Sequence, residues 1–504
     1  MEKYYITTPI YYVNSEPHIG HAYTSVLCDI FARFARLKSM EVKFLTGTDE
    51  HGQKVEKAAI DNNMAPKDFV ERIVPSFKKL LVDYNINNND FIRTTEERHR
   101  KSVAAIWDIL VKNNFIYLGK YSGWYAEKDE AFYKENEIDE QGKAPTGAPV
   151  EWLETPSYFF ALSKLQNKLL YFYKHNPNFI YPKSKLNEIT SFVEGGLEDL
   201  SVSRTNFTWG IKVPNDSEHV IYVWIDALTN YISALGYPSY NKSFWENAIH
   251  VIGKDILKFH AIYWPAMLIA ADIPLPKNII VHGWWIKDSK KMSKSLGNVI
   301  NPFDLVKKFG PDMVRYFLAR YVIIGNDGDF NRENFISLIN SELVNKIGNL
   351  VQRSLVFIQK FNDSQVPKLL DSEIDTLYLN ETILKNCEKL SSKLIKNFEE
   401  YNLHLALESI LELTDQANAY MENTAPWKLK DDKKSMQNIL YVLLEVIRYL
   451  AVSLTPFTPE GSNKILDMLL IDKSQRMLHH LNRKYSITTN VTLPKPEIIF
   501  SRLE

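Results

Sequence analysis

Cysteine is scarce in this sequence: the 504 residues contain two, Cys28 and Cys387, far apart along the chain. Two isolated thiols exclude a disulfide framework and a four-thiolate zinc site, and they are typical of proteins in a reducing compartment. The first residues, from Met1 to Tyr5, lack the charged-then-apolar order of a signal peptide. We therefore expect a cytoplasmic protein.

Long hydrophobic runs are also missing. The apolar stretch 262–273 is interrupted by Pro265 and Asp272, and the stretch 439–454 contains Glu445 and Arg448. Neither stretch has the unbroken apolar length of about 20 residues that spans a bilayer. The sequence therefore predicts a soluble protein with no membrane partner.

The chain has almost no excess charge of either sign. Its 60 basic and 61 acidic residues give a formal net charge of −1. A nucleic-acid ligand would need a local basic surface, because the composition as a whole neither favours nor excludes such a ligand. The length and the 45% hydrophobic content are enough for two or three domains.

Strand and helix patterns alternate in two separate parts of the chain. Residues 4–8 and 42–46 are rich in β-formers, and the apolar side chains of 26–37 between them recur at helical spacing. Residues 250–252 and 279–282 repeat this order around a helix near 259–270, so a parallel sheet is expected. The aromatic, turn-rich segment between the two parts predicts an inserted domain. Helical patterns from about residue 345 to 472 predict a helix bundle.

The first chemical signal is Pro17-His18-Ile19-Gly20-His21, at the start of the first long helix. His18 and His21 share one face of that helix, whose N-terminus offers unpaired N–H groups and a positive dipole to phosphates. Gly20 has no Cβ, so a flat ring can approach the backbone there. A lone His-x-x-His is more often a helix start with two solvated histidines, so this motif needs support from a second one.

The second signal is Lys291-Met292-Ser293-Lys294-Ser295, with Lys287 and Lys290 just before it. Ammonium groups on flexible stems suit a triphosphate whose charge moves during reaction, and the serines and Gly297 around them permit a loop that closes on substrate. Most Lys/Ser runs are simply exposed loops. The two motifs together are much more specific than either alone.

These two motifs resemble the HIGH and KMSKS signatures of the class I aminoacyl-tRNA synthetases. The resemblance implies an α/β Rossmann-type catalytic domain with an inserted connective domain, followed by an all-α helix bundle. The expected divisions are a catalytic domain at 1–115 and 222–284, an insertion at 116–221, a KMSKS loop and stem-contact region at 285–345, and an anticodon-binding bundle at 346–504.

The resemblance also implies roles at the ATP site, with Mg²⁺ accompanying the nucleotide. Catalytic roles on the phosphates would fall to His18, His21, Lys291 and Lys294. Asp255 would accept hydrogen bonds from the ribose. The residues expected to bind ATP are Gly20, Gly253, Asp255, His282 and Lys294.

Several further segments resemble the methionyl enzymes of this family, and the similarity runs over most of the chain. They are 9–14, 47–52, 222–228, 253–260 and 264–268. The resemblance implies activation of L-methionine and its transfer to tRNA(Met).

By this resemblance a slot of apolar and aromatic side chains with one polar tip holds the methionine side chain. A thioether suits such a slot, although without the family match each apolar residue would be assigned to ordinary core. Asp49 would bind the α-ammonium group, and Arg204 would hold Asp49 in place. The expected pocket residues are Ile10, Tyr12, Asp49, Trp224, Ala227, Leu228, Tyr231, Ile256 and His260.

The sequence departs from many relatives in the insertion, where those relatives carry Cys-x-x-Cys zinc knuckles. Residues 124–132 contain no cysteine, and the histidines of the insertion, His175 and His219, lie far from this place in the sequence. We therefore expect no zinc, and a knuckle held by packing of its aromatic residues. Those residues are Trp124, Tyr125, Phe132 and Tyr133.

Three residues of the C-terminal region match the anticodon-reading positions of the family: Asn349, Arg353 and Trp427. Asn349 and Arg353 are one helical turn apart, and an aromatic plane suits a splayed RNA base. After Pro426, Trp427 could equally anchor the start of a helix. The family match favours the anticodon role.

Other hypotheses stay open at this stage. A small-molecule nucleotidyltransferase shares His-x-x-His and the Rossmann sheet, but it is usually short and lacks the bundle. A non-enzymatic RNA-binding relative would be expected to have decayed motifs. A cysteinyl or isoleucyl enzyme is the nearest rival, disfavoured by the missing thiolates and the small insertion respectively. Dimeric relatives use an appended C-terminal domain. We do not expect such a domain in this sequence, so we expect a monomer.

Overall fold

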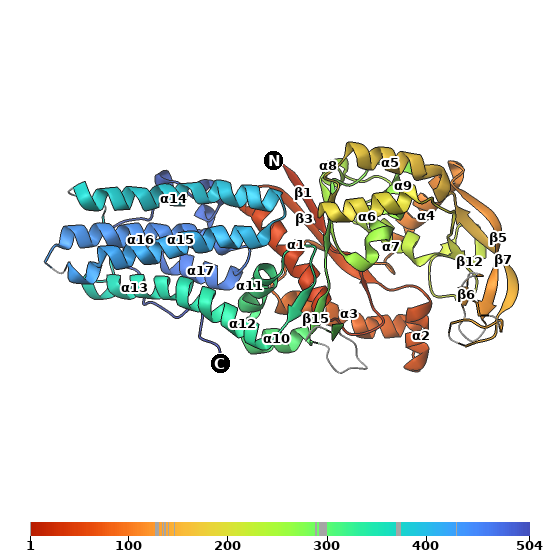
Figure 1. The fold of residues 1–504 in the computed structure, drawn as a ribbon, viewed down its shortest axis with the longest axis horizontal. Helices are drawn as coiled ribbons and strands as arrows, with labels where there is room; N and C mark the ends of the chain where they lie inside the picture. The colour runs from red at the N-terminus through yellow and green to blue at the C-terminus, as the bar shows by residue number, and fades with distance from the viewer. Residues whose placement is uncertain are drawn as a thin grey trace.

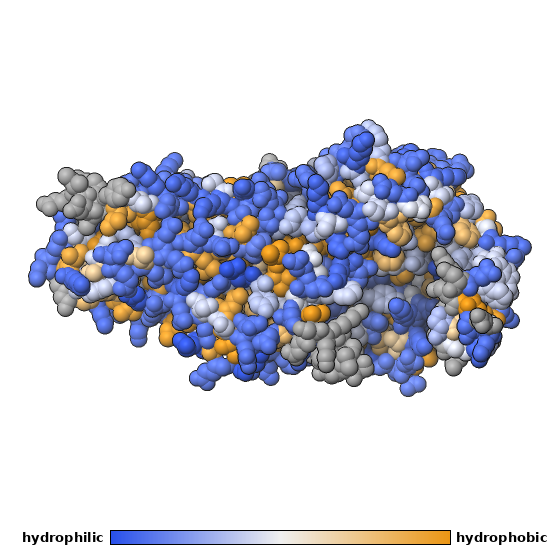
Figure 2. Space-filling model, in the orientation of Figure 1, coloured by the Kyte–Doolittle hydropathy of each residue, from blue (hydrophilic) through white to orange (hydrophobic). Residues whose placement is uncertain are grey.

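The computed structural model describes all residues except 1, 127–130, 134, 136–137, 140, 146, 288–289, 292–299, 369–373 and 430. The molecule is elongated, with a sheet-containing part at one end and long helices at the other (Figure 1). Hydrophilic side chains predominate on the face shown in Figure 2, with apolar ones scattered among them.

A parallel sheet forms the centre of the first part, as the strand–helix–strand order predicts. Its strands run in the order β2-β3-β1-β13-β14-β8, and β4 pairs with the other edge of β3. Every pairing in it is parallel. The strands are β1 (Lys3–Thr7), β2 (Tyr11–Tyr12), β3 (Glu41–Asp49), β4 (Asp90–Arg93), β8 (Ile180–Tyr181), β13 (Ala248–Gly253) and β14 (Asn278–His282).

The strand order reverses between β1 and β13, which lie side by side. The sheet continues from β1 to β3 in one direction and from β13 to β14 in the other. Ligands of open parallel sheets bind outside the carboxyl ends of the strands at such a reversal. The ends of β1, β3, β13 and β14 are therefore where a site is expected.

Helix α1 (Ile19–Leu37) carries most of the packing against this sheet, and most of its residues are buried. It has no proline and a single glycine in its first turn, so nothing in the sequence interrupts its 19 residues. Other helices surround the sheet on both sides: α2 (Gln53–Asp61), α3 (Pro66–Asp83), α4 (Glu97–Lys112), α5 (Gln166–His175), α6 (Lys183–Glu194), α7 (Val223–Ser233), α8 (Lys242–Trp245) and α9 (Trp264–Ala270), the last preceded by the π-helix η5 (Phe259–Tyr263).

The insertion is built on two small antiparallel sheets. One has the order β6-β5-β7-β9 and the other the order β10-β12-β11. Their strands are β5 (Ile116–Ala126), β6 (Ala131–Tyr133), β7 (Glu151–Phe160), β9 (Leu200–Ser201), β10 (Ser203–Arg204), β11 (Lys212–Val213) and β12 (Asp216–Ile221).

The range expected for the insertion, 116–221, contains β8, which belongs to the main sheet. β8 pairs in parallel with β14, through Ile180 with Ile279 and Tyr181 with Ile280. The chain therefore returns to the main sheet midway through the range. A strand of two residues is too short to show the alternation by which strands are recognised in a sequence.

The region after β14 contains a small sheet and two helices. Its elements are β15 (Trp285–Lys287), β16 (Lys290–Lys291), α10 (Pro302–Phe309), α11 (Pro311–Tyr321) and β17 (Gly328–Phe330). The helix that follows is unbroken from α12 (Arg332–Leu338) through the π-helix η7 (Ile339–Gly348) to α13 (Asn349–Phe361). The expected boundary at 345/346 therefore falls inside a continuous helix and does not separate two units.

The C-terminal part is the expected helix bundle. After α13 it consists of α14 (Ile374–Glu399), α15 (Leu403–Thr424), α16 (Lys433–Leu454) and α17 (Pro459–Met468). By length and composition α16 could cross a membrane, but 94% of its most apolar window is buried inside the protein. It is the core helix of the bundle (Figure 1).

A buried arginine joins the two parts. The side chain of Arg315, on α11, is fully buried, and its Nη2 lies 2.7 Å from Oδ2 of Asp29 on α1. Its nitrogens also donate to the carbonyl oxygens of Tyr84 (3.1 Å), Pro456 (2.7 Å) and Phe457 (3.2 Å). One guanidinium group thus bonds α1, the end of α3 and the turn between α16 and α17.

Replacing Arg315 by leucine should lower the free energy of unfolding by about 3–5 kcal/mol, because the buried Asp29 carboxylate would keep only one of its two cationic partners, Arg33 at 2.6 Å, and three carbonyl oxygens would lose their donor. Urea unfolding measures this loss. The matched control is Arg483→Leu, which removes a half-exposed arginine bonded to Glu381 and Glu388. Surface pairs contribute about 0–1 kcal/mol, so equal losses in the two variants would contradict the role assigned to Arg315.

Candidate functional site

The first turn of α1 is closed by its two histidines. His18 is the N-cap: its Nδ1 accepts a hydrogen bond from the backbone N–H of Gly20 at 3.0 Å. The backbone N–H of His18 in turn donates to Nδ1 of His21 at 3.0 Å. Because each Nδ1 is an acceptor, the proton of each neutral ring belongs on Nε2. Both rings are therefore potential hydrogen-bond donors at a helix N-terminus.

The two rings are held together and kept neutral. They stack with centroids 3.8 Å apart, and the rings of Tyr11 and Phe77 pack edge-on against His21 at 4.7 and 5.3 Å. Burial, and then the neighbouring His18, lower the pKa of His21 well below its usual value. A Cβ on Gly20 would approach the His18 ring to 2.8 Å, which explains the glycine. The Nε2–H donors of the two neutral rings and the positive end of the helix dipole are suitable partners for phosphate oxygens.

The ends of β13 and β14 lie beside this helix terminus. Nε2 of His282 is 2.8 Å from Oγ1 of Thr24, whose hydroxyl also lies 3.0 Å from the carbonyl oxygen of Gly20. At the end of β13, Oδ1 of Asp255 accepts a hydrogen bond from Nε1 of Trp284 at 3.1 Å. A Cβ on Gly253 would stand 2.6 Å from that same Oδ1. The structure thus brings the expected ATP-site residues of α1, β13 and β14 together.

A buried tyrosine–histidine pair closes one end of the expected methionine slot. The hydroxyl of Tyr231, on α7, lies 2.6 Å from Nε2 of His260, and Nδ1 of His260 lies 3.0 Å from the carbonyl oxygen of Ile256. Nδ1 must donate to that carbonyl, so Nε2 accepts the tyrosine proton. Burial lowers the pKa of His260 to about 4. The polar tip of the slot is therefore uncharged near neutral pH.

The walls of this slot are apolar. The indole of Trp224 stacks on the ring of Phe259 with centroids 3.7 Å apart and an interplanar angle of 6°. Ala227 and Leu228, on the same helix as Trp224, are buried. The remaining expected wall residues, Ile10, Tyr12, and Ile256, are half-buried.

Asp49 ends β3 and is 7% exposed. Its Oδ1 is buried and has no hydrogen-bond partner among the residues that the structure describes. Burial raises its pKa well above the usual value, Asp226 and Glu50 raise it further, and the His51 backbone N–H lowers it. The ionised form of this carboxyl group requires a cation close by, and none of the described residues forms an ion pair with it.

Arg204 makes other contacts in this structure, so the expectation that it holds Asp49 stays a prediction. Its Nη1 donates to the carbonyl oxygens of Ser201 and Ser203 and to Oγ of Ser201, and its guanidinium lies 4.8 Å from the ring centroid of Tyr222. Within the described part of the chain neither a hydrogen bond nor an ion pair joins it to Asp49. Arg204 therefore bonds the serines of β9 and β10 and packs on Tyr222, the residue before α7.

Sequence reasoning missed a buried network behind Asp49. Asp226 lies 2.7 Å from Nδ1 of His51 and 2.7 Å from Nε2 of His99. His51 and Asp226 lie inside segments 47–52 and 222–228, which carry the family resemblance, but neither was assigned a role. Nothing in the sequence marks His99, which sits on the buried face of α4.

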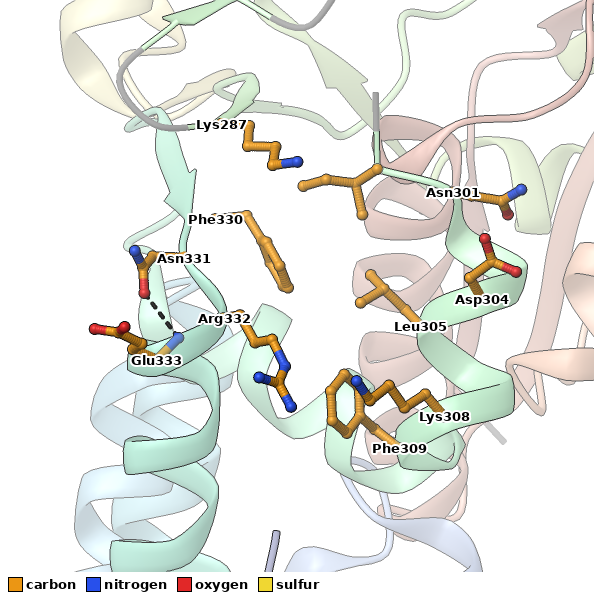
Figure 3. Close-up of a pocket in the computed structure, with 11 residues that line it drawn as sticks. Lys287, Asn301, Asp304, Leu305, Lys308, Phe309, Phe330, Asn331, Arg332 and Glu333 are labelled. Carbon is orange, nitrogen blue, oxygen red and sulfur yellow. Dashed lines mark hydrogen bonds between the residues drawn. The ribbon is translucent and has the colours of Figure 1, made fainter. Parts of the chain in front are cut away.

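The lysine motif lies largely outside the described residues: Lys294 does so entirely, and only the backbone of Lys291, in β16, is described. Beside it is a cavity of about 490 Å³ (Figure 3). Lys287, Lys308 and Arg332 bring cationic groups to this cavity, and Phe330 and Leu305 face each other across it. Asp304 and Glu333 also line the cavity, so three cationic side chains and two carboxylates surround it.

The three bundle residues also come together. Nη2 of Arg353, on α13, lies 2.7 Å from Oε1 of Glu422, and its guanidinium carbon is 5.7 Å from the ring centroid of Trp427. Trp427 is half-buried against the bundle core, and Asn349 is exposed one turn before Arg353. An aromatic plane with cationic and amide groups beside it is a suitable surface for an unstacked base.

Comparison with known proteins identifies the family. The sequence model of the family described as "tRNA synthetases class I (M)" matches residues 4–147 and 144–355, and that of the "Anticodon-binding domain of tRNA ligase" matches residues 380–499. The methionine–tRNA ligase of Rickettsia felis is 56% identical over 506 residues, covering 99% of this chain and 98% of the relative. The chain belongs to the methionine–tRNA ligase family.

Other members of the family are similar over their whole length. The methionine–tRNA ligase of Brucella suis is 45% identical over 510 residues, covering 99% of this chain and 98% of that protein. The solved structure of Mycobacterium tuberculosis methionyl-tRNA synthetase in complex with methionyl-adenylate is 41% identical, has a TM-score of 0.92 and covers 100% of both chains. These likenesses confirm the predicted family and fold.

The knuckle of the insertion is built on the antiparallel pairing of β5 with β6, with Trp124 opposite Tyr133 in the register. The indole of Trp124 packs edge-on against Trp152 at 5.5 Å. The side chains of Tyr125, Phe132 and Tyr133 lie outside the described residues, so their packing stays a prediction. Among the side chains that are described, no three of His, Cys, Asp or Glu gather as a metal site.

The neutral state of His260 predicts a specific loss of stability in acid. Its pKa is about 4 in the folded protein and about 6.5 unfolded, so between these values the unfolded chain binds the proton and the folded one does not. Stability from this group is thus present above pH 6.5 and falls as the pH drops towards 4. The loss between pH 7 and pH 5 should be about 2 kcal/mol.

Urea unfolding at the two pH values measures this loss, and His260→Leu is the control. The variant lacks the titrating ring, so its own loss should be smaller than that of the parent by the same amount. Equal losses in parent and variant would show that His260 is not held neutral.

Proposed function

We propose that this protein activates L-methionine with ATP to methionyl-adenylate and transfers the methionyl group to tRNA(Met), releasing AMP and pyrophosphate. One observation carries the proposal: Asp49, a buried carboxylate with an oxygen that no described group bonds, lies opposite Tyr12 of the expected slot, whose polar tip is the uncharged pair of Tyr231 and His260. An amino acid with an α-ammonium group and an uncharged apolar side chain fits both features. The family supports the same substrate.

In the first step an oxygen of the methionine carboxylate attacks the α-phosphorus of ATP, and the bond from that phosphorus to the pyrophosphate oxygen breaks. Negative charge shifts towards the leaving pyrophosphate. We propose that the Nε2–H groups of His18 and His21 and the positive end of α1 stabilise charge on the phosphates; the stacking of the two rings at the start of this helix supports the proposal. Lys291 and Lys294 are proposed to act on the pyrophosphate side.

The other end of the nucleotide is proposed to lie along β13 and β14. Oδ1 of Asp255, an acceptor at the end of β13, would take hydrogen bonds from ribose hydroxyls. Gly253 leaves room beside that oxygen, and His282 joins β14 to α1 through Thr24. In the second step a ribose hydroxyl of the 3′-terminal nucleotide of the tRNA attacks the carbonyl carbon of the adenylate, the bond from that carbon to the phosphate oxygen breaks, and AMP leaves as the hydroxyl loses its proton.

Discrimination among amino acids is assigned to the slot. Trp224, Ala227 and Leu228 exclude polar side chains, and the pair of Tyr231 and His260 offers a weakly polar end to the thioether sulfur. Because His260 is neutral, it does not attract an acidic side chain. An apolar pocket separates analogues that differ by one methylene by only about 1–3 kcal/mol.

Further parts of the proposal concern metal and assembly. Mg²⁺ is expected to arrive on the phosphates of ATP, where it neutralises charge, and no protein ligand is assigned to it. We propose that the insertion holds no zinc, because its knuckle lacks cysteine. The protein is proposed to act as a cytoplasmic monomer, with 285–345 contacting the tRNA stem.

The amino-acid substrate is tested by ATP–pyrophosphate exchange with each of the twenty amino acids. Methionine should support exchange far better than leucine, isoleucine or cysteine, because Asp49 and the slot around Trp224 fit it best. The same assay after chelation and return of Mg²⁺ alone should give undiminished exchange. Equal or faster exchange with another amino acid would refute the assignment.

The anticodon role is tested by Trp427→Ala, with Trp427→Phe as the matched control that keeps an aromatic plane. Exchange should be unchanged in both variants. Charging of tRNA by the alanine variant should fall about 5- to 150-fold in kcat/KM, because stacking on a base contributes about 1–3 kcal/mol. Thermal midpoints are measured alongside, since Trp427 also packs against the core. A stable alanine variant with normal charging would make Trp427 a packing residue only.

A further inference from the structure

A continuous chain of hydrogen bonds runs through the protein behind Asp49. Oδ2 of Asp226 lies 2.7 Å from Nδ1 of His51, and Oδ1 lies 2.7 Å from Nε2 of His99. Nδ1 of His99 lies 3.1 Å from Oγ of Ser233. All four side chains are buried, at 2% exposure or less. They join α4, α7 and the residues after β3.

The donors and acceptors in this chain fix the protons of His99. The hydroxyl of Ser233 donates its one proton to the carbonyl oxygen of Thr229, at 2.8 Å. Oγ of Ser233 must therefore accept from Nδ1–H of His99. Nε2 of His99 faces a carboxylate oxygen of Asp226, which is an acceptor, so it carries a proton too. With both nitrogens donating, His99 is an imidazolium.

Asp226 is the matching anion. Burial alone would raise its pKa, but the two histidines outweigh burial and lower the pKa of Asp226 to about 2. The pair of Asp226 and His99 therefore has no net charge. Breaking such a pair by neutralising one partner would leave a buried charge without compensation.

The same chain reaches Asp49 through His51. The backbone N–H of His51 faces the Asp49 carboxylate, while its ring bonds Asp226. The other groups that face Asp49 are its neighbour Glu50, Asp226 on α7 and Tyr12 on β2. Glu50 is itself compensated by Arg93, at 2.6 Å.

We propose that His99 is a positioning residue for the α-ammonium site: its buried imidazolium neutralises Asp226, so that Asp49 stays ionised and is left as the uncompensated carboxylate that binds the amino acid. This inference rests on the proposed function, in which Asp49 holds the α-ammonium group. His99 acts on Asp49 through Asp226 and His51 and touches no substrate. Without its charge, Asp226 would repel the negative form of Asp49.

His99→Gln tests the charge while keeping a donor towards Asp226. The measurement is kcat/KM for methionine in ATP–pyrophosphate exchange from pH 5.5 to 8.5. In the variant, the fall of kcat/KM on the acid side of this profile, its acid limb, should move to a pH about one unit higher. A shift of about that size is expected when one like charge is added near a carboxylate. At the low-pH end kcat/KM should fall about tenfold, with little change at pH 8.5 and in the KM for ATP. His175→Gln, an exposed histidine on α5, is the matched control and should leave the limb unmoved.

The double variant His99→Gln/Asp226→Asn separates charge from packing. It removes both charges of the pair, so its acid limb should return to that of the parent. An unmoved limb in His99→Gln, or an equal shift in the double variant, would overturn the proposal. A merely structural role for His99 would lower activity at all pH values and would not be restored by the second substitution.

A measurement on the unaltered protein covers the case in which the variants do not fold. The ¹⁵N chemical shifts of the His99 ring should show two protonated nitrogens at pH 7.5, and a neutral ring there would overturn the proposal. This result does not depend on the substrate. Failure of methionine to support exchange in the parent would instead refute the proposed function.

Discussion

The buried ion pair between Asp29 and Arg315 governs how the two parts of the molecule sit on each other. Asp29 lies on α1, about 16 Å from His18 at 1.5 Å per residue. Arg315 bonds Asp29 and also the carbonyl oxygens of Pro456 and Phe457 in the bundle. The helix that begins with His18 and His21 is therefore bonded directly to the bundle. The bundle cannot rotate against the sheet without moving α1 or breaking this pair.

Buried carboxylates elsewhere in the described chain have cationic partners or, at Asp312, a backbone N–H donor on each oxygen. Asp29 has Arg315, Glu50 has Arg93, and Glu445 has Arg448 at 2.8 Å. Such pairs offset the cost of removing charges from water. Asp49 departs from this pattern, because one of its oxygens is buried without a partner. A fold that compensates its other buried carboxylates and leaves this one at the end of β3 is prepared for a ligand cation.

The features that could be predicted from the sequence depend on neighbouring residues. The long strands, the cap at His18 and the two motifs all have local signals, and the sheet and α1 follow them. The strand at Ile180–Tyr181 was missed because two residues show no periodicity. The contacts of Arg204 could not be predicted, because they depend on how β10 lies against distant elements. His99 gave no signal, since its partner Asp226 is 127 positions away in the sequence.

Histidines in this protein have different charges because the groups around them differ. His260 meets a carbonyl at one nitrogen and a hydroxyl that can donate at the other, so its ring is neutral. His99 meets a carboxylate and a hydroxyl whose proton is already engaged, so both of its nitrogens donate. One ring therefore forms an uncharged wall and the other a counter-charge. The consequence is that the negative charge of this region resides on Asp49, beside an uncharged slot, which matches an amino acid whose only cationic group is its α-ammonium.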